Sequence, residues 1–277
     1  MEILILLIIF AATLVGSICG MGGGVIIKPL LDSLNMYQVF QISMISGCSV
    51  LAMSIASLGK HLISKTKFNY KIILCLSIGS ILGGLLGDVF LSLASDGLKN
   101  VLFDNYAYGL KIIQNSILGF MVLIVIFYMV FLFPKDKKLH IQNSIVLLIL
   151  GFVLGALSNF LEIGGGPINV CIFCFVCGMN VKEAGINSLF TILFAQITKF
   201  VKWGVTGKFV YDDIFNNNLT WWILALIIAF AVAGGLLGAV FNKKMDKKYV
   251  NILYCCALAF VFCLSVYNII SNAIALN

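Results

Sequence analysis

The sequence predicts an all-α, polytopic integral membrane protein made of two repeats. Hydrophobic residues form 61% of the 277-residue chain and charged residues only 10%, far from the composition of soluble domains. Apolar runs long enough to cross a bilayer, which takes about 20 residues, fill nearly the whole sequence. A Gly-Gly-Gly triplet also interrupts the apolar sequence twice, at two positions 142 residues apart. Together these observations favour a membrane domain with two similar halves.

Each half is expected to contain a broken helix or hairpin at its glycine triplet, followed by three transmembrane helices. In the first repeat, about 1–134, the expected helices are 3–20 and 25–35, then 39–59, 71–93 and 110–133. In the second repeat, about 143–277, they are 144–161 and 167–179, then 181–203, 218–241 and 249–271. No stretch remains for a soluble domain, so a single membrane domain spans 1–277. The N-terminal apolar run lacks a basic leader, so we expect it in the mature protein.

The triplets are expected to break the membrane helices. Glycine disfavours a helix interior by about 1 kcal/mol relative to alanine, and three in a row end the helix. Pro29 and Pro167 follow the two triplets, and proline suits the first position of a new helix. Paired broken segments at matching places in two halves are typical of a transporter's binding site.

A second repeated motif supports a duplication. The eight residues from Gly83 to Phe90 recur from Gly234 to Phe241 with seven identities. Motifs of small residues also arise independently where helices pack closely.

The lysines predict that the second repeat is inverted relative to the first. Three segments are basic, namely 60–71, 134–140 and 242–248, whereas 94–111 and 202–214 carry compensating aspartates. If each broken segment returns to its own side or crosses twice, all three basic segments lie in the cytoplasm and both termini outside. The net charge of +7 is therefore expected to orient the protein rather than to bind nucleic acid.

Both triplet regions resemble the signatures of the TauE/SafE sulfite exporter family. The first resemblance lies in residues 20–30, Gly-Met-Gly-Gly-Gly-Val-Ile-Ile-Lys-Pro-Leu, and the second in residues 163–168 and 182–189. It extends over nearly the whole chain and implies an integral membrane transporter of small sulfur-containing anions, such as sulfite, thiosulfate or a sulfonate of the sulfoacetate type. Glu162 departs from the family pattern, in which glycine is often found at this position.

Lys28 and Glu162 are candidate functional residues because an ionisable group inside the membrane is a functional hypothesis by default. Lys28 is expected to attract the anion, and Glu162 to exchange the proton that couples transport. The alternative is that the two charges neutralise each other.

Polar residues on the span 181–203 recur at helical spacing and form one stripe. This stripe predicts either a substrate pathway with Lys199 as a cationic step, or interhelical packing with lysines that reach the membrane surface. Asn169 is expected to offer an amide to an oxyanion or to bond the broken backbone. The candidate substrate-binding residues are Gly22, Gly23, Gly24, Lys28, Ser46, Gly164, Gly165, Gly166, Asn169, Asn187, Ser188, Thr191 and Lys199.

Cys171, Cys174 and Cys177 suggest an alternative function from another class. Thiols at this spacing can bind a soft metal or exchange with sulfane sulfur, as in a membrane thiol redox or sulfur-relay protein. Packing of small apolar side chains explains the same residues.

No catalytic constellation, metal site or cofactor motif is expected, so the chain is predicted not to be an enzyme. It is predicted to be a multi-pass protein of the plasma (inner) membrane. The predicted partners are a small sulfur-containing anion and the lipid bilayer, with a homodimer as one option.

Overall fold

The computed structural model describes residues 2–34, 36–64, 68–102, 105–133, 139–141, 143–163, 165–207 and 220–276. Within these residues the protein is all-helical and contains no strand. Gly164 lies outside the described residues, as do the following charged residues of the predicted loops: Lys65, Lys67, Asp104, Lys135, Lys137, Lys138, Asp212 and Asp213.

The helices match the expected elements in order. In the first half they are α1 (Glu2–Cys19), α2 (Gly24–Leu34), α3 (Val39–Ile63), α4 (Tyr70–Leu102) and α5 (Tyr106–Phe127), which continues as a π-helical turn, η2 (Tyr128–Leu132). In the second half they are α6 (Ser144–Phe160), α7 (Gly166–Phe175), α8 (Val181–Val205), α10 (Trp221–Lys244) and α11 (Lys247–Leu276). Six of them are long and apolar enough to cross a membrane, while α1, α6 and α7 are shorter apolar helices.

Several boundaries differ from the sequence prediction. α4 continues nine residues beyond the expected end, to Leu102. Its 33 residues extend about 50 Å at the α-helical rise, which exceeds the roughly 30 Å hydrocarbon core of a bilayer. Pro29 does not start a helix but lies inside α2. Pro167, by contrast, stands in the first turn of α7, as predicted.

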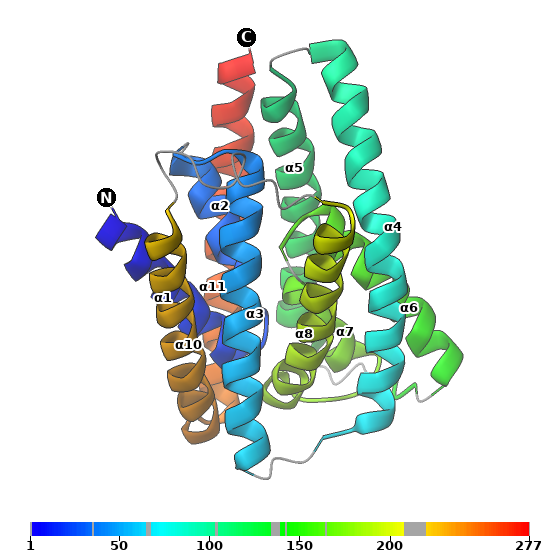
Figure 1. The fold of residues 1–277 in the computed structure, drawn as a ribbon. Coiled ribbons are helices and arrows are strands. Elements are labelled where there is room, and N and C mark those ends of the chain that lie inside the picture. Colours follow the sequence, from blue (N-terminus) through cyan, green and yellow to red (C-terminus); the bar gives the residue numbers. More distant parts are fainter. Residues whose placement is uncertain are drawn as a thin grey trace.

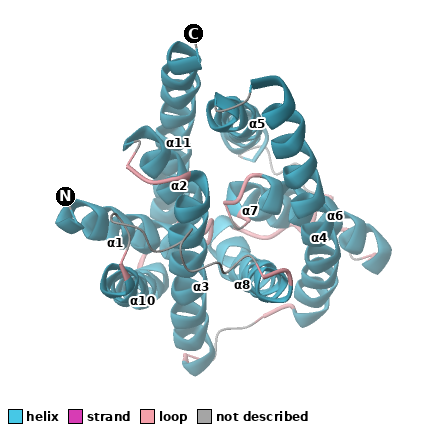
Figure 2. Ribbon diagram, turned by 45° about the horizontal axis from the view of Figure 1, so that its top comes forward, coloured by secondary structure: helices cyan, strands magenta, loops and turns pink. Residues whose placement is uncertain are grey.

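The short half-helices lie at the centre of the molecule. Figure 2 shows α2, α3, α7 and α8 in the middle, with α1 and α10 on one side and α4 and α6 on the other. Large apolar side chains such as Phe120 and Trp222 are exposed on the outer helices, where lipid replaces water as the surrounding medium.

The repeated glycine motif makes the same kind of contact in both halves. A Cβ atom on Gly83 of α4 would collide with the backbone of Phe152 on α6. A Cβ atom on Gly238 of α10 would lie 2.6 Å from Cβ of Ser17 on α1. Small residues thus let α4 approach α6, and α10 approach α1, at backbone distance.

Equivalent helices of the two halves run in opposite directions. In Figure 1, α3 descends where α8 ascends, α4 ascends where α10 descends, and α5 descends where α11 ascends. The first helix of each half also packs on a helix of the other half: α1 packs on α10, and α6 packs on α4. These directions are those that two inverted repeats require; a common origin of the halves stays a prediction.

The described parts of the basic segments lie at one end of the molecule, the lower end in Figure 1. There, Lys182 at the start of α8 donates hydrogen bonds to the carbonyls of Lys243 (3.0 Å) and Met245 (2.9 Å) at the end of α10. The described part of 94–111 lies at the opposite end, although Lys111, counted with that segment, is a buried residue of α5.

Candidate functional site

The two glycine breaks meet in the interior. Gly24 begins α2, and a Cβ atom there would lie 2.5 Å from the carbonyl oxygen of Ile163 in the second break and 2.9 Å from Oγ of Ser46. Gly166 begins α7, and its Cβ atom would lie 2.8 Å from Val25. The N-terminal ends of two half-helices are therefore side by side, where their free N–H groups and positive dipole ends favour an anion.

The second break needs glycine for its backbone conformation. Gly165, the N-cap of α7, has φ of 120°, a region that side chains with a Cβ rarely adopt. Glu162 has φ of 57° although it is not glycine, which costs about 1–2 kcal/mol.

Lys28 and Glu162 form a buried ion pair across the two breaks. Nζ of Lys28 lies 3.1 Å from the Glu162 carboxylate, and the side chains are only 4% and 7% exposed. Lys28 also donates to Oε1 of Gln114 at 2.7 Å and to the carbonyl of Leu161 at 2.8 Å. All three lysine N–H donors therefore have acceptors, as a buried ammonium requires.

Lys199 of α8 is a second buried cation close to this pair. It is 2% exposed, donates to Oγ of Ser43 at 2.7 Å and lies 4.7 Å from the Trp203 ring centroid. The Ser43 hydroxyl in turn contacts the Glu162 carboxylate. Among the described residues, Lys199 has no carboxylate within the 4.0 Å of an ion pair. The expectation that this lysine reaches the membrane surface is therefore wrong.

The predicted stripe on α8 consists of Ser188, Thr191, Ala195, Lys199 and Lys202, flanked by Asn187 and Gln196. All of these except Lys202 are buried. Ser188 donates to the carbonyl of Gly20, so it joins α8 to the first break. Lys202 is partly exposed and pairs with Asp88 of α4 at 3.2 Å. Three other polar residues on α8, Asn187, Thr191 and Gln196, each have a buried side-chain oxygen without a hydrogen-bond partner. This set, together with the matching atoms of α3 and α7, comprises Ser46 Oγ, Asn169 Oδ1, Asn187 Oδ1, Thr191 Oγ1 and Gln196 Oε1.

A cavity of about 440 Å³ leads from one end of the molecule to Glu162. Its wall includes polar residues near the end of α4 and the start of α5, among them Asp96, Lys99 and Tyr106. Trp203, which contacts Lys199, also lines it. The lining residues from the end of α4 and the start of α5 belong to the end opposite the basic segments, so the cavity provides a path from that end to the buried charges.

Sequence reasoning missed Ser43, Gln114 and a second buried pair, Asp32 and Lys111. Asp32 stands one helical turn after Lys28, and this spacing was the available signal. Lys111 and Gln114 lie near the start of α5 and gave no such signal, because only packing brings them to α2.

The three thiols on and after α7 do not form a metal site. No group of three or more metal-ligating side chains occurs in the described part of the chain. Cys174 is buried, while Cys171 and Cys177 are partly exposed, and none of the three is in a disulfide.

Comparisons with known proteins agree with this architecture. The model of the family described as sulfite exporter TauE/SafE matches residues 5–265. A Bacillus subtilis (strain 168) protein named "Probable membrane transporter protein YunE" is 26% identical over 285 aligned positions, covering 96% of this chain and 97% of that protein. No solved structure matches the chain.

Proposed function

Because the chain belongs to the sulfite exporter TauE/SafE family and is a multi-pass membrane transporter, we propose that it moves a small sulfur-containing anion as a secondary transporter or facilitator. Sulfite, thiosulfate and short sulfonates, including sulfoacetate, are the candidate substrates. The proposed binding residues are Gly22, Gly23, Gly24, Lys28, Ser46, Gly164, Gly165, Gly166, Asn169, Asn187, Ser188, Thr191 and Lys199. Glu162, predicted from the sequence to exchange the coupling proton, is the carboxylate next to the anion.

The observation that carries the proposal is an excess of buried positive charge. Among the described residues, Lys28, Lys111 and Lys199 are buried, against the carboxylates of Asp32 and Glu162. Asp88 is left out because it pairs with the partly exposed Lys202. An uncompensated ammonium costs several kcal/mol in an apolar interior, and a bound anion beside Lys199 removes this cost.

The backbone around the excess charge supplies what an oxyanion needs. The N-termini of α2 and α7 provide N–H donors, and Ser46 and Thr191 provide buried hydroxyl donors that have no hydrogen-bond partner in the structure. The Glu162 carboxylate pairs with the Lys28 ammonium. We propose that the anion reaches Lys199 through the cavity and competes with Glu162 for the cations.

Transport then requires that the site open to each side in turn. The pairing of α1 with α10 and of α6 with α4 divides the molecule into two groups of helices that can move as units. Rocking of one group against the other around the glycine breaks would close the observed cavity and open a path toward the basic end.

The test is a binding and flux screen on purified, reconstituted protein with sulfite, thiosulfate, sulfate and short sulfonates. Lys199→Met should lower the affinity for the transported anion by about tenfold or more, since it removes a buried charge partner. Lys244→Met, at an exposed position, is the matched control and should bind as the wild type does. Equal affinity of the two variants, or no flux of any sulfur anion, contradicts the proposal.

A further inference from the structure

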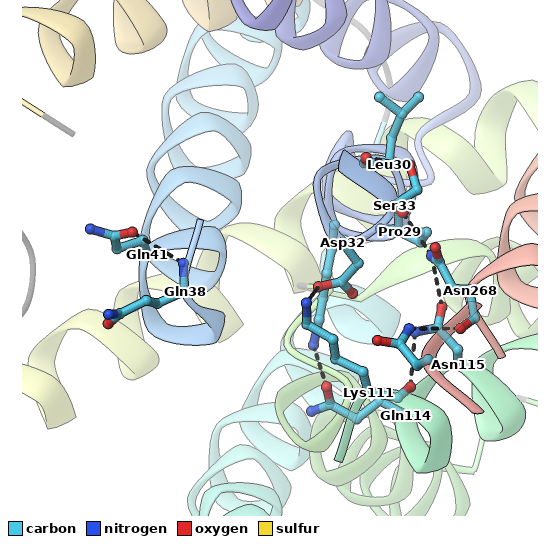
Figure 3. Close-up of polar contacts among 12 residues, drawn as sticks. Pro29, Leu30, Asp32, Ser33, Gln38, Gln41, Lys111, Gln114, Asn115 and Asn268 are labelled. Atoms are coloured by element: carbon cyan, nitrogen blue, oxygen red, sulfur yellow. Dashed lines mark hydrogen bonds and ion pairs between the residues drawn. The ribbon is translucent and has the colours of Figure 1, made fainter. Parts of the chain in front are cut away.

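A second buried charged cluster adjoins the proposed anion site. Asp32 of α2 is 2% exposed and lies 3.9 Å from Nζ of Lys111 on α5, as drawn in Figure 3. Neither carboxylate oxygen of Asp32 accepts a hydrogen bond of normal geometry in the structure. Asp32 thus has one long ion pair and the nearby Asn115 amide, whereas Glu162 pairs with Lys28 at 3.1 Å and contacts Ser43. A longer ion pair compensates a buried carboxylate less well.

The groups around Asp32 come from four elements. The charged ones are Lys28 on its own helix, Lys111 on α5 and Glu162 in the second break. α5 also presents the uncharged Asn115. Asn268 of α11 donates to the carbonyl of Pro29 at 2.7 Å and approaches Oδ1 of Asn115 at 3.4 Å, which ties α11 to the cluster (Figure 3).

A small cavity connects this cluster to the anion site. It has about 10 Å³ of free volume and is lined by Asp32, Asn115, Lys28 and Gln114 among others. This volume is about enough for one water molecule, and the polar lining supplies its partners. Protonation of Asp32 would therefore change the electrostatic potential at Lys28, because both residues line the same small polar cavity.

We propose that Asp32 is the proton-binding residue of the transporter and that its protonation lets the site accept a divalent anion. The inference rests on the proposed function, because it assigns the coupling ion of the same site. With Asp32 ionised and the Asp88–Lys202 ion pair counted as neutral, the buried groups of the described residues carry three positive and two negative charges, which matches one monovalent anion. A proton on Asp32 removes one negative charge, and the surplus then matches a dianion. One proton bound per dianion follows from this charge balance.

A metal cation suits the cluster less well than a proton. Lys111 already lies against Asp32, and an ammonium within this distance repels a second cation. A proton neutralises the carboxylate without needing further oxygen ligands.

Two anions of fixed charge provide the test. Thiosulfate stays divalent and methanesulfonate monovalent from mildly acidic to mildly alkaline pH, so any pH dependence of binding comes from the protein. In the wild type, thiosulfate affinity should rise toward acid pH by up to about tenfold per pH unit, the limit for one linked proton. Methanesulfonate affinity should depend little on pH.

Substitutions at Asp32 alone and at Asp32 together with Lys111 have opposite expected effects on which anion binds more tightly. Asp32→Asn mimics the protonated state, so thiosulfate should bind tightly at all pH values. The double variant Asp32→Asn with Lys111→Gln restores a single surplus charge, so it should bind methanesulfonate well and thiosulfate weakly, again without pH dependence. The double variant leaves no uncompensated Lys111 and carries the test if the single variant does not fold. Asp246→Asn, at an exposed carboxylate in the α10–α11 turn, should behave as the wild type.

Infrared difference spectra on acidification supply a readout without any substrate. The protonated carboxyl band of the wild type should lose a component in Asp32→Asn and keep it in Asp246→Asn. If neither anion binds to the wild type, the proposed function fails while this band still decides the role of Asp32. Thiosulfate binding that stays pH-dependent in Asp32→Asn, loss of the dependence only in Glu162→Gln, or an unchanged band overturns the inference.

Discussion

Charge balance in the interior explains the roles of individual residues. Each buried ammonium in the described core has a specific acceptor: Lys28 has Glu162, Gln114 and a carbonyl, Lys111 has Asp32, and Lys199 has Ser43. Only Lys199 makes no ion pair among the described residues. Lys199 is therefore the buried cation best placed to pair with a bound anion.

Glu162→Gln tests whether the ion pair with Lys28 is structural. The change keeps the size of the side chain but leaves the Lys28 ammonium uncompensated, so we expect a loss of about 3–5 kcal/mol in stability. A simultaneous Lys28→Met should restore most of the melting temperature, because it removes the orphaned charge.

Flux measured against pH in the same variants completes this test. If Glu162 is structural, the remaining flux of Glu162→Gln keeps the pH dependence of the wild type. Flux that becomes independent of pH assigns the coupling proton to Glu162 instead.

Gly24→Ala tests the close approach of the two breaks. Its Cβ would lie 2.5 Å from the carbonyl oxygen of Ile163, and backbone at this distance must shift. We expect a loss of roughly 1–3 kcal/mol, comparable to overpacking of a core. Gly59→Ala in α3, where nothing lies within 4 Å, is the control and should not lower the melting temperature. Equal melting temperatures for the two variants would show that the breaks are not in contact.

At the scale of elements, α7 combines two features that the sequence left open. Its first turn carries the candidate anion contacts, and its later turns carry the cysteines. Cys174 packs in the core, and Tyr254 of α11 donates to the carbonyl of Pro167 at 2.6 Å. The half-helix is thus fixed at its start by hydrogen bonding and along its length by packing.

Replacement of Cys171, Cys174 and Cys177 by serine separates the transporter from a thiol relay. Serine is close in size, and burial of the hydroxyl at Cys174 should cost only about 1–3 kcal/mol of stability. We expect anion flux per folded molecule to stay within a few-fold of the wild type. A complete loss of activity in protein that remains folded would favour the redox or sulfur-relay alternative.

At the scale of the whole molecule, opposite helix directions place the corresponding ends of related helices at opposite ends of the protein (Figure 1). The C-terminal ends of α3 and α10 then lie at the basic end, and the C-terminal ends of α4 and α8 at the other. The positive-inside rule assigns the basic end to the cytoplasm.

Cysteine-accessibility labelling checks this orientation in a variant whose native cysteines are replaced. Lys60→Cys and Lys243→Cys should react only with reagents that reach the cytoplasm. Asp96→Cys and Thr220→Cys should react from outside; all four positions are exposed. Labelling of Lys60→Cys and Lys243→Cys from opposite sides would exclude the inverted arrangement.

The sequence by itself determined the membrane class, the order of helices and the positions of both breaks. These properties depend on local composition: long apolar runs must be helical in lipid, and consecutive glycines end a helix. Boundaries were less accurate where a helix leaves the bilayer, as at the end of α4, because hydropathy does not determine where a helix stops in water.

Only the tertiary structure decided which charges meet. Lys28 and Glu162 are 134 positions apart and were open to two interpretations, while Asp32 and Lys111 were not recognised as a pair. Burial of Lys199 likewise depends on α3 lying against α8, since an isolated helix would let the same side chain reach the membrane surface. Long-range packing sets the partner and the dielectric surroundings of each charge, and these are properties of the assembled helices rather than of any segment.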